Sequence, residues 1–298
     1  HMEEGAYYTW NWRQLEAALP DETLRDWARE RYGLSQRGNA INDLHNEMGG
    51  RNVLYRAQTT AELAKEFEVD LITANQRSTE VDRLLLQARA RRPAVPVDDK
   101  VIAVWNGYMI TTLAMAGQLL DEPRYIDAAT ATAIFLMQTL YDEKKGVLYR
   151  DWRDGERGVP GFSEDYAAVA EGLLTLYRIT GQKQWLSIAR MLMDRQLSLF
   201  YDAVGGGFFS TPEDTELWLR AKQASDGAVL SVNGVSLHVL LQLGELTDRR
   251  RYLDYAWETG AWAGAQLDNA AAVMPYSLMV WDELVALNSG RAGPTVQP

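Results

Sequence analysis

The chain has 298 residues, a formal net charge of −11, and a globular composition with 47% hydrophobic and 24% charged residues, which excludes a fibre or a disordered chain. It has no cysteine, which excludes disulfides and thiolate chemistry, and its negative charge argues against nucleic-acid binding. No apolar run reaches the roughly 18 residues of a membrane span, so we expect a cytoplasmic protein without membrane contact.

Residues 3–97 are predicted to form an irregular N-terminal part whose helices pack on the repeated body that follows. Asp21–Tyr32 has the pattern of a capped helix, and Thr60–Arg91 is predicted to be helical again. Between them, Gly33–Ala57 is rich in Gly and Asn and shows no period, which indicates an ordered excursion without regular structure. No segment has the composition of a linker, so a single domain is expected.

An internal repeat dominates the rest of the chain. Trp105–Tyr125 aligns without gaps on Val232–Tyr252, and Tyr166–Trp185 forms a third copy between them. Each copy contains a helix, a short turn, and a second helix that opens with an aromatic residue, which is the pattern of a helical hairpin. Repeated helical hairpins are therefore predicted over residues 98–290, followed by a disordered tail at 291–298.

The two helices of each hairpin differ in character. The second helices carry one apolar stripe and should form an outer layer, whereas the first helices mix large apolar residues with Ala and Gly on several faces, which suits an inner layer. Gly-rich segments flanked by aromatic residues, at Tyr141–Tyr149 and Tyr201–Phe209, indicate short β-hairpins at the rim. Inner helices are expected to start near Asp98, Ser163, Ser225 and Asn269. The period of about 60 residues is typical of an all-α (α/α) toroid.

Four segments carry a family resemblance. The runs Glu4–Trp10, Arg92–Ile110, Gly161–Tyr166 and Gly205–Phe209 resemble, in the same order, those of the spermatogenesis-associated, thioredoxin-domain-containing proteins, the bacterial YyaL type. The resemblance extends from Glu4 to about Leu287. It implies a six-hairpin, glycosidase-like toroid, related in architecture to N-acylglucosamine 2-epimerases and unsaturated glucuronyl hydrolases.

The same resemblance implies what the chain lacks. Family members begin with a thioredoxin-like domain, and Glu4 falls well inside the family pattern, so we expect the thioredoxin-like domain and the first hairpins to be missing. About four hairpins of an incomplete toroid would remain, without thioredoxin activity. The segment Asp226–Gly234 departs from the family pattern by losing a Pro and a Gly, which puts the geometry of that loop in doubt.

Acidic residues stand where the inner helices are predicted to begin. Asp99, Asp165 and Asp226 should therefore converge on one rim, where two carboxylates across a cavity could serve as general acid and base. The alternative role is helix capping, because Asp is favoured at helix N-termini.

Further polar and aromatic residues near this rim are candidates for binding substrate. The aromatic ones could stack on sugar rings or pack in the core, and the two Asn residues, which are equivalent in the repeat, could contact ligand or tie hairpins together. The candidates are Tyr8, Trp10, Lys100, Trp105, Asn106, Glu164, Tyr166, Asn233 and His238. Only His45 and His238 could act as the proton-transferring histidines of an epimerase, which disfavours a two-histidine mechanism.

Two functions remain open from the sequence. The first is a carbohydrate-binding or carbohydrate-processing toroid that uses rim carboxylates on a small polar ligand, with no metal or cofactor. The second is a non-catalytic partial toroid that acts as a scaffold, or that completes its ring with a partner chain or a second copy of itself. The second function predicts an exposed apolar edge at the first and last helices.

Overall fold

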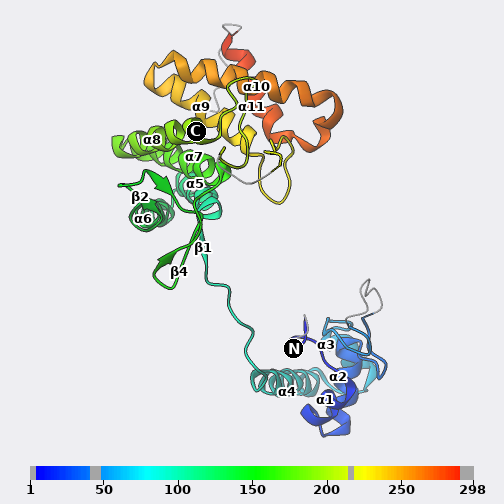
Figure 1. Cartoon of the computed structure of the whole chain (residues 1–298). Coiled ribbons are helices and arrows are strands. Elements are labelled where there is room, and N and C mark those ends of the chain that lie inside the picture. The colour runs from blue at the N-terminus through cyan, green and yellow to red at the C-terminus, as the bar shows by residue number, and fades with distance from the viewer. Residues whose placement is uncertain (1–4, 41–47, 214–217, 289–298) are drawn as a thin grey trace. The chain divides into compact units, whose positions relative to one another are not determined.

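The structure is a computed structural model that describes residues 5–40, 48–213 and 218–288. The chain divides into two compact units, His1–Asp98 and Asp99–Pro298 (Figure 1). Each unit is described by itself below. The expectation that the N-terminal helices pack on the repeated body therefore stays a prediction.

The described residues of the first unit form four helices, of which the second matches its predicted helix. The carboxylate of Asp21 accepts hydrogen bonds from the amides of Thr23 and Leu24, and Gly33 ends this helix in the left-handed conformation. The predicted Thr60–Arg91 helix is in fact two helices, because Glu68 adopts a positive φ of 51° and Asp70 caps a new start. The four helices are α1 (Trp12–Ala18), α2 (Glu22–Tyr32), α3 (Thr60–Glu66) and α4 (Leu71–Ala90).

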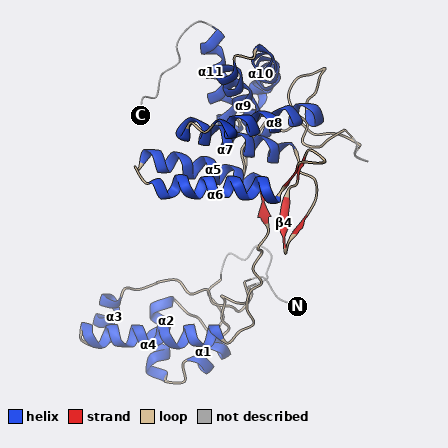
Figure 2. Cartoon of the chain, turned by 90° about the vertical axis from the view of Figure 1, so that its left-hand side faces the viewer, coloured by secondary structure: helices blue, strands red, loops and turns tan. Residues whose placement is uncertain are grey.

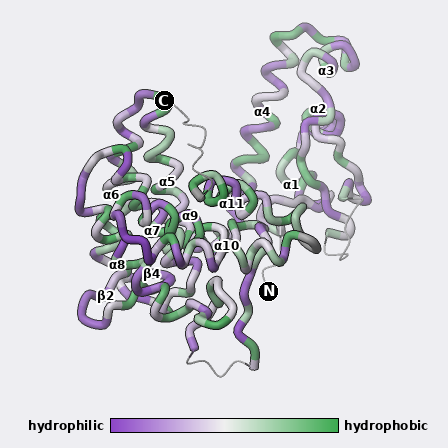
Figure 3. Tube along the Cα trace, turned by 90° about the horizontal axis from the view of Figure 1, so that it is seen from above, coloured by the Kyte–Doolittle hydropathy of each residue, from purple (hydrophilic) through white to green (hydrophobic). Residues whose placement is uncertain are grey.

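The core of the first unit is built around two buried tryptophans. Trp27 donates from its indole nitrogen to Ser78 of α4, and Trp10 pairs through its backbone with Asn52. Arg92 stacks on the Trp10 ring and donates to three carbonyl oxygens of residues 6, 7 and 9. The buried residues of α4 are Ala74, Ser78, Val81 and Leu85, whose helical spacing places them on one face, and hydrophilic residues lie between them along the helix (Figure 3).

The second unit confirms the predicted repeat as three helical hairpins followed by one more helix (Figure 2). The hairpins are α5 (Ala103–Leu119) with α6 (Pro123–Thr139), α7 (Ser163–Thr180) with α8 (Lys183–Phe200), and α9 (Val232–Thr247) with α10 (Arg250–Ala270). A 3₁₀ turn, η1 (Ala271–Val273), leads into α11 (Pro275–Asn288). The fold is the all-α toroid type that the sequence predicts.

The inner layer consists of α5, α7, α9 and α11, which pack on one another in that order. Because α7 and α9 have inner neighbours on both sides, they are buried on nearly all faces, whereas α5 is buried on one face only. Glycines allow the close approach of α5 and α7. A Cβ on Gly107 would lie 2.6 Å from the backbone of Ala168, and one on Gly172 would lie 2.8 Å from the carbonyl oxygen of Gly107.

Three of the four predicted inner-helix starts need correction. A strand, β1 (Val101–Ile102), precedes α5, so this helix begins later than Asp98. Ser231 caps α9, which begins seven residues after Ser225. Asn269 lies in the last turn of α10, because that helix continues further than expected. Only Ser163 marks its helix start correctly.

Two small sheets lie at the ends of the hairpins. The predicted β-hairpin at Tyr141–Tyr149 is confirmed as β2 (Tyr141–Asp142) paired with β3 (Val147–Leu148), and Tyr201 forms a single antiparallel bridge with Phe208. A three-stranded sheet was not expected. It joins β1 to β4 (Asp151–Arg153) and β4 to β5 (Glu156–Arg157).

Candidate functional site

Asp165 is a fully buried carboxylate at the start of α7. Its two oxygens accept hydrogen bonds from the amides of Val104, at 3.1 Å, and Phe162, at 2.9 Å, and Arg150 lies 3.2 Å away. Burial raises the pKa of Asp165 to about 6, although the Phe162 amide and Arg150 act in the opposite direction. The carboxylate thereby joins the start of α5 to the start of α7.

Asp226 occupies a similar position in front of α11. One oxygen accepts from the amide of Ser231, at 2.8 Å, and the other accepts from the amide of Tyr276, at 2.9 Å. Like Asp165, this residue joins two inner helices through main-chain hydrogen bonds. Both carboxylates therefore have the geometry of the capping alternative.

The other charged candidates lie closer to solvent. Asp99 is exposed and pairs with Arg153 of β4, at 2.7 Å, because the strand β1 separates it from the start of α5. Lys100 is also exposed. Glu164 is half-buried and accepts from Arg150 at 2.6 Å, so that Arg150 holds both acids at the start of α7.

Three of the remaining candidates have mainly packing roles. Tyr166 is buried and its hydroxyl accepts from the amide of Leu148, while Trp10 belongs to the core of the first unit. Asn233 is buried, and its side chain exchanges hydrogen bonds with both backbone groups of Phe208 and donates to the carbonyl of Gln223. This Asn holds the Gly-rich segment against α9, as the tying alternative predicts.

Three other candidates remain partly accessible. Trp105 on α5 is 59% exposed and Tyr8 in the first unit is 60% exposed, so a large part of each side chain is accessible to solvent. Asn106 is half-buried and donates to the carbonyl of Ile102 at 2.8 Å. His45 lies outside the described residues.

His238 stands at the centre of a polar cluster formed by three inner helices. Its Nδ1 lies 2.9 Å from the carboxylate of Glu171 on α7 and 2.9 Å from the hydroxyl of Tyr276 on α11. Its Nε2 lies 2.7 Å from the amide nitrogen of Gln242, one turn further along α9. Tyr276 also donates a short hydrogen bond to Glu171. These four residues form what we call the inner-helix cluster.

The hydrogen bonds define the protonation pattern of this cluster. An ionised Glu171 can only accept, so Nδ1 of His238 carries a proton. A neutral His238 then has its lone pair on Nε2, where it accepts from the Gln242 amide. Glu171 is buried, whereas 23% of the His238 side chain is exposed to solvent. The cluster therefore holds an oriented imidazole that is partly exposed to solvent.

Tyr108 on α5 is a half-buried phenol in the negative field of the inner-helix cluster and the rim acids. Burial raises its pKa, and the negative charges of Glu171, Glu164, Asp226 and Asp165 raise it further, in that order. Burial and the neighbouring Glu171 likewise raise the pKa of Tyr276. Both phenols therefore stay protonated near neutral pH, where they can donate hydrogen bonds.

Sequence reasoning found His238 but missed Tyr108, Glu171, Gln242 and Tyr276. A signal for Glu171 was present in the repeat. Glu171 lies fourteen residues before Trp185, the aromatic residue that opens the second helix of its hairpin, and His238 lies fourteen residues before Tyr252. Equivalent positions on neighbouring inner helices face the same side of the layer, so the two side chains meet.

No group of three or more metal-ligating side chains is positioned to hold an ion in the part of the chain that the structure describes. Over the same part, no helix combines the length and the apolar character that crossing a membrane requires.

The chain resembles curated proteins over most of its length. It is 36% identical to spermatogenesis-associated protein 20 of Rattus norvegicus over 275 residues, and 35% identical to that of Homo sapiens over 271 residues. Over these residues the chain belongs to the spermatogenesis-associated protein 20 family. These matches cover 85% and 84% of the chain but only 34% of each relative, so the chain spans about a third of their length. No family model matches the sequence.

Solved structures share the fold at low sequence identity. The glycoside hydrolase family 76 mannosidase of Bacteroides thetaiotaomicron matches with a TM-score of 0.54 and 16% identity, over 77% of this chain and 68% of that one. The cellobiose 2-epimerase of Spirochaeta thermophila matches with a TM-score of 0.51 and 16% identity, over 66% and 56% of the two chains. Both are toroids of the glycosidase-like type, which agrees with the fold expected from the family resemblance.

Proposed function

We propose that the second unit binds a small polyhydroxylated ligand, of the sugar class, against its inner helices, and that His238, oriented by Glu171, accepts a proton from the ligand and returns it. The observation that carries the proposal is the Glu171–His238 hydrogen bond, with the phenol of Tyr276 on the same carboxylate. A mannosidase and an epimerase with this fold act on sugars, and this fold similarity supports the choice of ligand class.

Each residue of the inner-helix cluster has a role in this proposal. A ligand hydroxyl replaces the Gln242 amide at Nε2 of His238, which accepts the proton as a general base. Glu171 holds the ring orientation and stabilises the imidazolium that forms. Further out, the ligand would contact the exposed side chain of Trp105 and the polar side chains of the rim, which are Asp99, Lys100, Asn106 and Glu164. We place proton transfer on this cluster because the oxygens of Asp165 and Asp226 are already engaged by main-chain amides.

Thermal unfolding with a panel of neutral mono- and oligosaccharides tests the proposal. A bound sugar should raise the Tm of the wild type with the logarithm of its concentration once this exceeds Kd, because the sugar binds only the folded state. Glu171→Gln should abolish that rise, whereas Glu143→Gln, on an exposed turn, should keep it. If no sugar raises the Tm, the sugar class is wrong.

The non-catalytic scaffold is a second candidate, favoured by the surface of α5. This helix contains no charged residue, yet Trp105, Met109 and Leu119 are exposed along one of its faces. Such a stripe is typical of a surface that packs against another helix. Light scattering that shows a monomer at all concentrations would count against completion of the ring by a second copy.

A further inference from the structure

Gln242 is a buried amide of which only one half makes a hydrogen bond. It lies on α9, one turn after His238, and is 5% exposed. Its amide nitrogen lies 2.7 Å from Nε2 of His238, whereas its carbonyl oxygen is buried and has no hydrogen-bond partner among the described residues. A buried acceptor without a partner destabilises the folded state. A role for this oxygen in another state of the site would account for its position.

The two protonation states of His238 need opposite groups at Nε2. The neutral ring, which donates from Nδ1 to Glu171, has its lone pair on Nε2 and accepts from the Gln242 amide. Once Nε2 carries a proton, the N–H of Gln242 faces it as a second donor at 2.7 Å. The imidazolium therefore needs an acceptor at this position. The unpartnered oxygen of Gln242 belongs to the amide that already lies there.

A half-turn of the terminal amide exchanges its two groups. The last torsion of a Gln side chain joins an sp³ to an sp² carbon and has a broad, roughly two-fold preference. Nitrogen and oxygen can therefore exchange places with little change in the shape of the side chain. The turned amide presents its oxygen to Nε2–H of His238. Helix α9 need not move, because Gln242 and His238 stay one turn apart on it.

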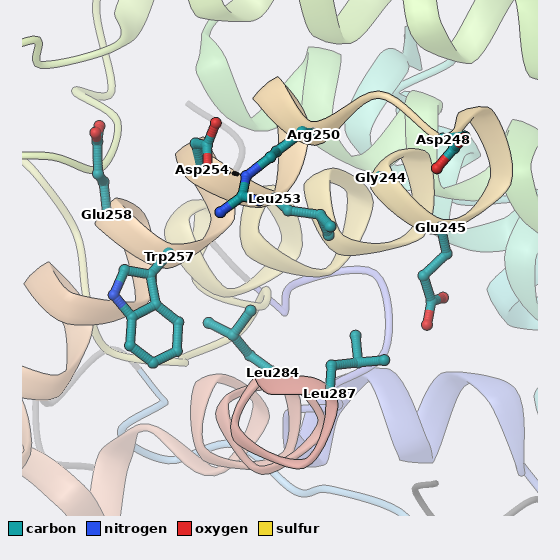
Figure 4. Close-up of a pocket in the computed structure, with 10 residues that line it drawn as sticks. All are labelled: Gly244, Glu245, Asp248, Arg250, Leu253, Asp254, Trp257, Glu258, Leu284 and Leu287. Atoms are coloured by element: carbon teal, nitrogen blue, oxygen red, sulfur yellow. Dashed lines mark ion pairs between the residues drawn. The ribbon is translucent and has the colours of Figure 1, made fainter. Parts of the chain in front are cut away.

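The other charged and titratable groups around the ring do not face Nε2. Glu171 on α7 and Tyr276 on α11 both contact His238 through Nδ1, and the charge of Glu171 also acts on Tyr108 of α5. The acids of α10 line a groove of about 970 Å³ between α10 and α11, and no residue that lines this groove belongs to the inner-helix cluster (Figure 4). Gln242 is thus the residue placed to serve Nε2.

We propose that Gln242 is a positioning residue that holds His238 in both protonation states by turning its terminal amide. The inference rests on the proposed function, in which a ligand hydroxyl gives its proton to Nε2. The O–H bond of the ligand breaks and the N–H bond of the ring forms, and the return of the proton reverses both changes. Gln242 itself exchanges no proton. When the ligand oxygen moves away from Nε2, the turned amide keeps the imidazolium oriented.

NMR of the ligand-free full chain tests the proposal, because the same turn should follow when the ring takes a proton from water. The probes are the ring nitrogens of His238 and the side-chain amide of Gln242, followed in ¹⁵N-labelled protein from about pH 8 to about pH 5. We expect the Gln242 amide protons to lose the chemical shift of a hydrogen bond over the same pH range in which Nε2 becomes protonated.

Gln242→Met tests the direction of the effect. Met keeps the length of the side chain but offers neither N–H nor carbonyl oxygen, and the hydrogen bond to the charged ring is the stronger of the two that it removes. The ratio of imidazolium to neutral imidazole at a given pH should therefore fall at least about three-fold. Gln118→Met, at an exposed position of α5, is the matched control and should leave the ratio unchanged. An unchanged fold of both variants is checked by their Tm.

Three results would overturn the proposal. One is a Gln242 amide signal that stays in place while His238 becomes protonated. Another is a ratio that rises in Gln242→Met, because a fixed N–H donor favours the neutral ring. The third is a ring that stays neutral down to about pH 5 in the wild type. None of these measurements uses a sugar, so their failure leaves the proposed ligand class standing, and a sugar panel without effect on Tm leaves the amide turn to be decided by NMR alone.

Discussion

Two buried carboxylates on the same helix, Asp165 and Glu171, have opposite surroundings. Asp165, in the first turn of α7, is held mainly by main-chain amides of its own and the neighbouring inner-helix start. Glu171, in the middle of α7, is held by side chains of α9 and α11. Burial alone therefore does not distinguish a structural acid from a functional one. Under the proposed function the type of partner separates the two acids, because main-chain amides fix a fold whereas an imidazole and a phenol can exchange protons.

Removing the structural acid should give the largest change in stability. Asp165→Ala leaves the amides of Val104 and Phe162 buried without acceptors and removes a partner of Arg150. We expect the free energy of unfolding to fall by about 3 kcal/mol in urea denaturation. A loss below about 1 kcal/mol would show that the two inner-helix starts are held together without this carboxylate.

The pH dependence of stability provides a second test of Asp165. Its pKa in the folded protein, about 6, lies above its ordinary value of 3.8, so the folded state binds the proton more tightly. The contribution of Asp165 to the free energy of unfolding is therefore largest below about pH 4 and declines as the pH rises to about 6, by about 2–3 kcal/mol.

Asp165→Asn is the matched control for that titration because its amide cannot ionise. The unfolding free energy of the wild type, relative to that of this variant, should fall between pH 4 and pH 6. A rise over the same range would mean that the amides and Arg150 lower the pKa of Asp165 by more than burial raises it.

Glu171→Gln should have a smaller effect on stability and a larger one on ligand binding. The amide keeps the size of the side chain and can still accept from Nδ1 of His238, so we expect a loss of about 1 kcal/mol in unfolding free energy. The response of Tm to sugar should disappear. A variant that unfolds much more easily but still binds sugar would assign Glu171 to the structural class together with Asp165.

Tyr276→Phe should give the smallest effect. It removes the hydroxyl that contacts both Glu171 and His238 but keeps the ring in its packing position. We expect less than about 1 kcal/mol of lost stability, and weaker sugar binding without its abolition. Binding that is unchanged would remove the phenol from the site.

The sequence predicts the repeated part of the fold well and the site only partly. The gapless repeat predicts the hairpins because each hairpin must bury the same apolar stripe. The starts of α5 and α9 lie later in the chain than predicted, because β1 precedes α5 and a long segment precedes Ser231. The rim acids stand at predicted helix starts, which is also where main-chain amides are free to hold them.

The cluster residues were harder to predict for a physical reason. Glu171 and Gln242 look like ordinary polar residues in a helix, and their roles depend on the packing of α7, α9 and α11. Tyr276 reaches His238 across a close packing of α11 on Gly234 of α9, where a Cβ would lie 2.8 Å from the hydroxyl oxygen of Ser277 and 3.1 Å from the Tyr276 ring. Local sequence does not encode such distances between helices.

The most direct test of the central claim is the imidazole nitrogen spectrum of protein labelled with ¹⁵N at its three histidines. His238→Asn would assign the signal, and the same sugar panel would then be titrated into the wild type. The account predicts a ligand-dependent shift of the His238 Nε2 resonance, while the other histidine signals stay in place. A panel that leaves the His238 signal unmoved, or a ligand that raises the Tm without moving it, would contradict the assignment of the site to the inner-helix cluster.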